Sequence, residues 1–236
     1  MKIFLFFLFF FLGACFGSFF NVLCERLPRR ESILGRSFCR ACKKKLSLKE
    51  LVPIFSYIFL KGRCSKCKSR IPFFYFLNEL LFGLLFLNIF FVRNTLDFVF
   101  LLGSFFFFYY VFLADLRFLE VPDLIFLFGF LFGLFFCAFK GNLTSSFFDG
   151  ILFSLPFFLI AFFSKEKLMG FGDPIFIFIL SFFFEKEKYF FSVLLGFIFG
   201  GIISLFLIFL KKKTLKSKVP LLSFLSLSAI IFFVSF

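Results

Sequence analysis

Long apolar stretches separated by short polar segments make up most of this chain. Eight stretches consist almost entirely of Phe, Leu, Ile and similar residues, at 3–23, 73–92, 98–114, 124–139, 147–163, 168–184, 189–210 and 219–236. A helix needs about 17–25 apolar residues to cross a bilayer, and several stretches lie near the short end of that range. The pattern predicts an all-α polytopic membrane protein with about eight transmembrane helices, although seven or nine also fit it.

The longest polar segment lies between the first two stretches. It divides the chain into a first transmembrane helix at 1–23, a loop at 24–72 and a transmembrane helical domain at 73–236. Residues 24–76 contain fourteen Lys and Arg but three Glu. A basic loop can bind nucleic acid, but beside membrane helices the positive-inside rule explains its charge more simply. We therefore expect a cytoplasmic loop and no nucleic-acid partner.

The Lys and Arg residues also predict the topology of the whole chain. With the loop inside, the inside segments carry twenty-two Lys and Arg and the outside segments five, and the basic run at 211–218 is one of the inside signals. Both termini are then outside. Leu12-Gly13-Ala14-Cys15 resembles a lipoprotein cleavage site, but the apolar run continues to Leu23, which favours an intact first helix.

Composition narrows the possible chemistry. The 236 residues are 62% hydrophobic with a mean hydropathy of +1.08, well above the roughly 45–50% apolar content of soluble domains. The 57 Phe residues have no fixed spacing that would mark a site. The sequence contains no His, which excludes His-based zinc proteases and Ser–His or Cys–His nucleophile pairs. Hydrolytic chemistry would have to use Asp, Glu, Lys, Ser or Cys.

Two Cys-x-x-Cys pairs lie in the basic loop. Cys39 and Cys42 form the first pair, and Cys64 and Cys67 form the second. This spacing is typical of a closed four-thiolate zinc site with a structural role. Disulfides are the alternative, but a reducing cytosol disfavours them. The other cysteines, at positions 15, 24 and 137, lie in or beside apolar stretches and are expected to be packing residues.

Two carboxylates stand out against the apolar background. Asp115 ends one apolar stretch, and Asp173 follows Gly170-Phe171-Gly172 at the start of another. A carboxylate in a hydrocarbon layer costs about 2.5 kcal/mol or more, so such a residue is a candidate for function. The two glycines would let a substrate backbone approach Asp173 closely. Alternatively, each Asp only marks where a helix meets water, and the same choice applies to Glu79.

Four motifs resemble those of the bacterial type IV prepilin peptidases, the bifunctional leader peptidase/N-methyltransferases. They occur in the family's order: Gly17-Ser18-Phe19-Phe20-Asn21-Val22 with Glu25-Arg26-Leu27-Pro28-Arg29; the Cys pairs with Ile71-Pro72, Tyr75 and Asn78-Glu79; Asp115 with Pro122-Asp123; and Gly170-Phe171-Gly172-Asp173. The family usually continues the last motif with Val-Lys, whereas this chain has Pro174-Ile175. Pro is compatible with a first helical turn, which makes Asp173 a candidate helix cap.

The resemblance implies an intramembrane aspartic protease of the bacterial inner membrane. It implies that Asp115 and Asp173 are catalytic, that Gly170, Gly172 and Asp123 serve the substrate path, and that prepilins or pseudopilins of a type IV pilus or type II secretion machinery are cleaved. It also implies methylation of the new N-terminus by S-adenosylmethionine, and the Cys loop favours this bifunctional type. Two other classes fit the bare sequence: a membrane transporter that relays ions through Asp residues, or a structural assembly protein that uses the zinc loop to bind a partner.

Overall fold

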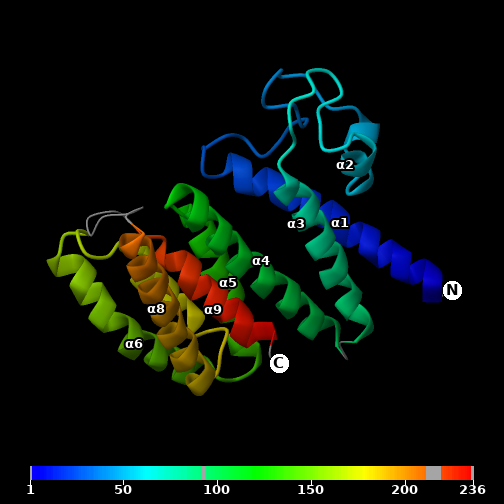
Figure 1. The fold of residues 1–236 in the computed structure, drawn as a ribbon. Coiled ribbons are helices and arrows are strands. Elements are labelled where there is room, and N and C mark those ends of the chain that lie inside the picture. The colour runs from blue at the N-terminus through cyan, green and yellow to red at the C-terminus, as the bar shows by residue number, and fades with distance from the viewer. Residues whose placement is uncertain (1, 92–93, 211–218, 235–236) are drawn as a thin grey trace. The chain divides into compact units, whose positions relative to one another are not determined.

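The chain folds into two compact helical units, Met1–Leu102 and Gly103–Phe236. The computed structural model shown in Figure 1 describes residues 2–91, 94–210 and 219–234. Over this part of the chain it contains helices and isolated β-bridges but no strand. The basic run at 211–218, and the ends of the apolar stretches at 92 and 235–236, lie outside the described residues.

The first unit is a pair of long helices joined by the basic loop. Its elements are α1 (Lys2–Arg26), η1 (Leu48–Glu50), α2 (Phe55–Phe59), α3 (Phe73–Phe86), η2 (Leu87–Phe90) and the start of α4 (Thr95–Phe118). Helices α1 and α3 lie side by side, and the loop with η1 and α2 continues from their shared end (Figure 1). Pro72 stands immediately before α3, where its missing N–H costs no helical hydrogen bond.

Two glycines on one face of α1 set the distance between α1 and α3. A Cβ atom added at Gly13 would lie 2.4 Å from the Phe82 carbonyl oxygen, and one added at Gly17 would lie 2.7 Å from the Asn78 carbonyl oxygen. Neither distance is compatible with a real side chain, so the two backbones are in direct contact. This is the small-xxx-small arrangement by which membrane helices approach closely.

The second unit contains the rest of the chain. Its elements are the remainder of α4, α5 (Asp123–Phe139), α6 (Leu143–Phe163), α7 (Gly172–Leu180), α8 (Lys186–Phe209) and α9 (Leu221–Val234). Helices α8 and α9 pack side by side (Figure 1), and the short helix α7 packs against α5, α6 and α9. Residues of α7 such as Phe176, Ile177 and Leu180 are fully buried, so α7 forms the centre of this unit.

Five of the described helices are long and apolar enough to cross a bilayer. They are Ile3–Arg26, Phe73–Phe90, Thr95–Phe118, Leu143–Phe163 and Lys186–Leu207. Helices α5 and α9 are apolar but shorter. The stretch 168–184, which we expected to span, forms only the nine-residue helix α7, because residues 168–171 precede the helix as irregular backbone and residues 181–184 leave it in turns. The polytopic all-α class is confirmed, and the number of spans remains a prediction.

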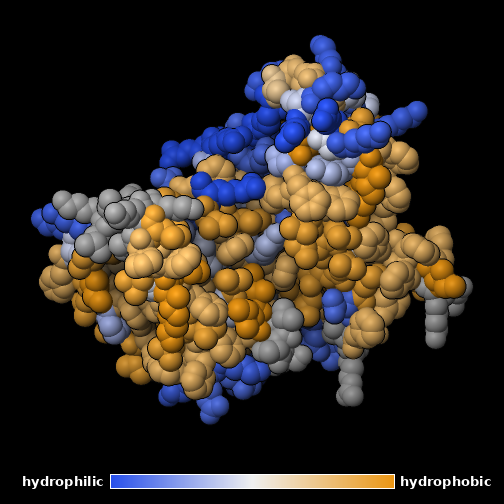
Figure 2. All heavy atoms as spheres, viewed as in Figure 1, coloured by the Kyte–Doolittle hydropathy of each residue, from blue (hydrophilic) through white to orange (hydrophobic). Residues whose placement is uncertain are grey.

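The surface of the helices is apolar and several polar groups are buried, the reverse of a water-soluble protein. Figure 2 shows hydrophobic residues over the helical surfaces and hydrophilic residues over the loop between α1 and α3. Leu205 on α8 is 68% exposed, whereas Asn78 on α3 and Ser192 on α8 are fully buried. Apolar side chains directed outward and polar side chains directed inward are expected when hydrocarbon surrounds the helices.

Candidate active site and metal centre

Asp115 lies inside α4 and not at its end. The helix continues to Phe118, three residues past the carboxylate, and the Asp115 side chain is 5% exposed. A group that only marked a helix–water boundary would be solvated, so the boundary interpretation does not describe Asp115. In the sequence the apolar stretch ends at residue 114, because the next residue is charged. The helix itself continues to Phe118, because its backbone hydrogen bonds do not depend on hydropathy.

The carboxylate of Asp115 is held by the first turn of α9. The backbone N–H of Ser223 donates to Asp115 Oδ2 at 2.7 Å, and the Ser223 hydroxyl donates to the same oxygen at 2.9 Å. The hydroxyl oxygen also lies 3.2 Å from the Phe112 carbonyl oxygen. Hydrogen bonds to a charged acceptor are among the stronger ones in proteins, so the orientation of this carboxylate is well defined.

Asp173 lies in the first turn of α7 and is also buried, with 9% exposure. We expected it to cap the helix, but this expectation is wrong: α7 begins one residue earlier, and Phe171 occupies the N-cap position. Pro174 is tolerated because the N–H groups of a first turn have no helical partner. Gly172, directly before Asp173, lies beside Leu222 of α9, and the next residue of α9, Ser223, binds Asp115. The first turn of α9 therefore adjoins the segments of both aspartates within the second unit.

The other residues that we expected along the substrate path have different environments. Gly170 is exposed, and a Cβ atom added there would meet nothing within 4 Å. A Cβ atom added at Gly172 would lie 3.6 Å from Leu222 Cδ1, an ordinary contact distance. Neither glycine has a positive φ angle, so the backbone does not require them. Asp123 begins α5 and is exposed, where a carboxylate is favoured by the helix dipole.

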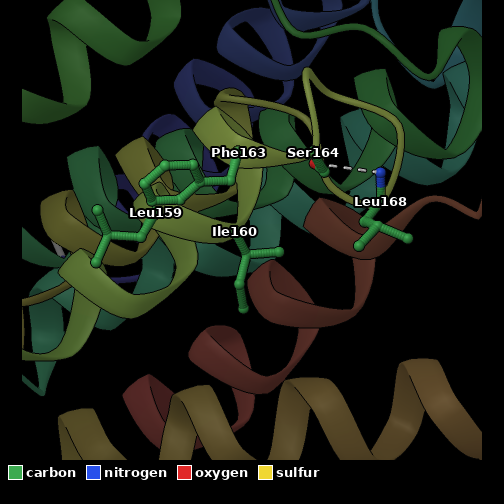
Figure 3. A pocket seen from close by; sticks show the side chains of 5 residues that line it. All are labelled: Leu159, Ile160, Phe163, Ser164 and Leu168. Carbon is green, nitrogen blue, oxygen red and sulfur yellow. Dashed lines mark hydrogen bonds between the residues drawn. The ribbon is translucent and has the colours of Figure 1, made fainter.

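A separate hollow in the second unit lies at the end of α6. It is lined by Leu159, Ile160, Phe163, Ser164 and Leu168, with a volume of about 420 Å³ (Figure 3). The Leu168 N–H donates to the Ser164 hydroxyl at 3.5 Å, the dashed line in Figure 3. No titratable side chain lines this hollow, so it offers no acid–base chemistry of its own.

In the first unit, the four loop cysteines form one cluster. Their sulfur atoms all lie within 4.8 Å of one another, and the Cys39 and Cys67 sulfurs are 3.8 Å apart. Zn–S bonds of about 2.3 Å in a tetrahedral site place the sulfurs about 3.8 Å apart, so the cluster has the size of a zinc site. A disulfide requires sulfurs about 2.05 Å apart, and none of the four cysteines forms one.

The two Cys-x-x-Cys turns have the same backbone geometry. In the first turn the N–H of Lys43 donates to the Cys39 carbonyl, and in the second the N–H of Lys68 donates to the Cys64 carbonyl. Lys43 and Lys68 have φ angles of 57° and 58°. An antiparallel bridge closes each turn, Phe38 with Lys45 and Arg63 with Arg70. Each turn therefore directs both of its sulfurs to one side, toward the other pair.

The charge on the cluster is distributed unevenly. The Cys42 N–H lowers the pKa of Cys39 to about 6, and the hydroxyl and N–H of Ser69 lower the pKa of Cys67. For Cys42 the Lys44 N–H lowers the pKa, but desolvation and hydrogen bonds with the other thiols outweigh it and raise the pKa to about 11. Thiols that compete in this way for negative charge are suited to a cation that neutralises all of them.

A Lys44–Glu50–Ser65 contact joins the two turns. Lys44 Nζ donates to Glu50 Oε1 at 2.8 Å and to Ser65 Oγ at 2.7 Å, and the Ser65 hydroxyl also donates to Glu50. The Lys44 ammonium, followed by the N–H of Ser47, lowers the pKa of Glu50 to about 2. These side chains hold the two halves of the cluster together.

Arg40, between the two cysteines of the first turn, ties the loop to the helices. Its Nε donates to Glu25 of α1 at 3.0 Å and its Nη1 donates to Glu31 at 3.0 Å. The Tyr75 hydroxyl of α3 donates to the other Glu25 oxygen. These contacts were not predicted from the sequence, because nothing in the spacing of the charged residues identifies their partners.

Glu79 is buried and hydrogen-bonded to the loop. It is 8% exposed, and its Oε2 accepts the backbone N–H of Ile54 at 2.6 Å. Ile54 has a φ of 65°, a strained value for a β-branched residue, and the carboxylate holds the loop in this conformation. Nearby, Asn78 Nδ2 donates to Asn21 Oδ1 at 2.6 Å, which links α3 to α1. The polar residues of α1 and α3 therefore anchor the loop.

Two family models match the chain in succession. The description "Bacterial Peptidase A24 N-terminal domain" matches residues 11–93, and "Type IV leader peptidase family" matches residues 100–205. The break between them falls close to the division between the two structural units after Leu102.

Individual relatives agree with these matches. A Vibrio cholerae protein is 29% identical over 178 residues, which are 66% of this chain and 68% of that protein. A Bacillus subtilis protein is 41% identical over 78 residues, which are 33% of this chain and 32% of that protein. A Myxococcus xanthus protein is 45% identical over 78 residues, which are 33% of this chain and 23% of that protein. All three are named prepilin leader peptidase/N-methyltransferase. No solved structure matches the chain.

Proposed function

The chain belongs to the type IV prepilin peptidase family, and from this premise we propose that it is a membrane-embedded aspartic endopeptidase that removes the basic leader from type IV prepilins and pseudopilins. The observation that carries this proposal is the pair of buried carboxylates, Asp115 and Asp173, whose segments both contact the first turn of α9 in a chain that has no His. The structure supplies no other pair of this kind among the described residues of that unit.

In the proposed mechanism the two aspartates share one proton. Two carboxylates close together in a low-dielectric site do not ionise together, so one carries the negative charge and the other the proton. The ionised aspartate takes a proton from the attacking water, and the protonated aspartate donates to the scissile carbonyl oxygen. Proton transfer to the leaving amine then releases the leader. The titration belongs to the pair as a whole.

The substrate reaches the pair past the glycine motif. Gly170 is exposed and Gly172 has only ordinary contacts, so neither of these two positions presents a side chain to an approaching peptide. Asp123 begins the helix that follows the Asp115 segment and lies on an exposed turn. We propose that the leader peptide passes along these residues as it enters the site.

The protein is a multi-pass membrane protein, and we propose the bacterial inner membrane as its location. Five candidate spans and the apolar helical surface support membrane insertion. The excess of Lys and Arg in the loop supports a cytoplasmic position for the loop and for the aspartates, with both termini in the periplasm. The count of about eight membrane helices belongs to the same proposal.

We propose that the cysteine cluster binds one structural Zn²⁺. The sulfur spacing and the two matching turns fit a tetrahedral four-thiolate site, and such a site leaves no position for substrate. Zinc would therefore stabilise the loop and take no part in peptide cleavage. Through Arg40 and Glu25 the folded loop would in turn be fixed against α1 and α3.

N-methylation with S-adenosylmethionine is the second proposed activity, and it rests on the names of the relatives. The open cavity of the loop, about 300 Å³, is lined by Arg36, Phe38, Lys43 and Lys45. Three cations and no acid do not suit a sulfonium cation, so this cavity does not fit the methyl donor. A type IV pilus or type II secretion machinery would supply the substrates.

Replacing either aspartate by asparagine should abolish cleavage. Asp115→Asn and Asp173→Asn preserve volume and hydrogen-bonding atoms but remove the shared proton, so we expect at least about a thousandfold loss of leader cleavage. Detergent-purified protein is incubated with a prepilin, and the new N-terminus is sequenced. Asp97→Asn, at an exposed position of the same helix as Asp115, is the matched control and should cleave normally. Substantial cleavage by either active-site variant contradicts the dyad.

A further inference from the structure

Helix α9 reaches the site although it lies beyond the residues that the family model matches. That match ends at residue 205, whereas α9 covers Leu221–Val234. The first turn of α9 contacts the segments of both aspartates. Ser223 binds Asp115 on α4, and the Leu222 side chain lies beside Gly172, directly before Asp173. The start of α9 therefore joins the two halves of the proposed catalytic pair.

Three serines of α9 are fully buried, but their hydroxyl groups have different partners. The Ser226 hydroxyl donates to backbone carbonyls of its own helix, at 2.7 Å to Leu222 and 3.0 Å to Ser223. The Ser228 hydroxyl donates to the Ser192 carbonyl of α8 and to the Leu225 carbonyl. Of these three serines, Ser223 is the one that binds a charged group, so its role differs from packing alone.

Ser223 restrains Asp115 through two donors on one oxygen. Both bonds go to Oδ2, so the plane of the carboxylate is fixed and Oδ1 receives neither of them. The hydroxyl has one proton and two acceptors in reach, Asp115 at 2.9 Å and the Phe112 carbonyl at 3.2 Å. The bond to Asp115 is favoured because it is shorter and its acceptor is charged. A catalytic acid or base must be held within about 0.5 Å of its productive position.

We propose that Ser223 is a positioning residue of the peptidase reaction, holding the Asp115 carboxylate so that its second oxygen serves the attacking water and Asp173. This inference rests on the proposed function. Its structural alternative is that Asp115 only satisfies the first-turn N–H groups of α9, as a helix cap would. In that case the hydroxyl of Ser223 would influence folding but not turnover.

The test compares Ser223→Ala with Ser226→Ala in full-length, detergent-purified protein. Ser223→Ala removes one of the two donors to Asp115, and we expect kcat for prepilin cleavage to fall at least about tenfold while KM changes less than about twofold. Ser226→Ala removes a hydroxyl that is bonded within the helix and should leave both constants unchanged. A thermal unfolding scan of each variant separates lost turnover from lost stability.

Two further substitutions at Ser223 keep the inference testable if Ser223→Ala does not accumulate in membranes. Ser223→Thr retains a hydroxyl donor, whereas Ser223→Cys offers only a weak S–H donor. We expect the Thr variant to exceed the Cys variant in kcat at equal amounts of folded protein. Equal kcat for these two variants, or wild-type kcat for Ser223→Ala, overturns the inference if Asp115→Asn is inactive. Cleavage by Asp115→Asn would instead overturn the proposed function.

Discussion

At the scale of single residues, the main feature of the protein is a set of buried carboxylates, whose burial costs free energy. Asp115 and Asp173 are both less than a tenth exposed, at a cost of about 2.5 kcal/mol or more each in a membrane. Glu79 bears a similar cost but is bonded to the Ile54 N–H, so its burial is explained by loop anchoring. Asp115 also has a structural partner, Ser223, so it is the burial of a second carboxylate, Asp173, beside the same turn of α9 that favours chemistry.

Adding a methyl group at the glycine motif should affect substrate binding more than folding. Gly170→Ala meets open space and Gly172→Ala meets Leu222 only at an ordinary contact distance, so both variants should fold normally. If the peptide backbone passes here, we expect KM to rise about tenfold, equivalent to about 1.4 kcal/mol. Steady-state cleavage of a prepilin peptide measures this effect.

The control for the glycine variants is Gly201→Ala on α8, where the added methyl group also meets nothing within 4 Å. It should leave KM unchanged. Unchanged KM in both Gly170→Ala and Gly172→Ala would show that the substrate does not approach Asp173 along this backbone.

At the scale of secondary-structure elements, close helix packing positions the polar residues. Gly13 and Gly17 let α1 contact the backbone of α3, and this brings Asn21 within hydrogen-bonding distance of Asn78. The short helix α7 has a different role. Its nine residues are too few to cross a bilayer, and it instead presents Asp173 from a mostly buried position.

A single methyl group at Gly17 should separate α1 from α3. The new Cβ atom would lie 2.7 Å from the Asn78 carbonyl oxygen and 2.8 Å from Glu79 Cα, and neither backbone atom can rotate away. We expect Gly17→Ala to destabilise the protein by about 1–3 kcal/mol, the usual cost of overpacking. The thermal unfolding midpoint of the detergent-purified variant should fall by several degrees. A midpoint equal to that of Gly201→Ala would mean that the helices are not in contact at this position.

At the scale of the whole molecule, the chain combines a loop-bearing helical pair with a helical unit that carries both aspartates. The division after Leu102 lies close to the boundary between the two family matches, at 93 and 100. Each unit has its own candidate site, a thiolate cluster in the first and a carboxylate pair in the second. We therefore expect that a substitution at one candidate site leaves the other intact.

Loss of one cluster thiolate should remove zinc without removing the carboxylate pair. We expect Cys42→Ser to lower bound zinc from about one equivalent to below 0.2 equivalents per chain, because a three-thiolate site is open to water and binds more weakly. Elemental analysis of the purified protein measures the content. Cys15→Ser, outside the cluster, should retain the metal. Unaltered zinc in Cys42→Ser would mean that the four cysteines are not the ligands.

The sequence by itself determined the class of the protein, because hydropathy, the Lys and Arg distribution and motif spacing are local properties of the chain. These properties were sufficient to predict an all-α membrane protein, the four clustered cysteines, and the family to which the chain belongs. They also indicated Asp115 and Asp173 as candidates, since a carboxylate in an apolar stretch is visible without coordinates.

Only the tertiary structure decided which groups meet. The bond from Ser223 to Asp115 joins residues 108 positions apart, and the bond from Tyr75 to Glu25 joins residues 50 positions apart, so no local pattern encodes either contact. The length of α7 could not be predicted from hydropathy either. A hydropathy pattern shows where apolar residues lie, but not where the backbone hydrogen bonds of a helix begin and end. Helix packing brings distant side chains together, and that packing depends on the whole chain at once.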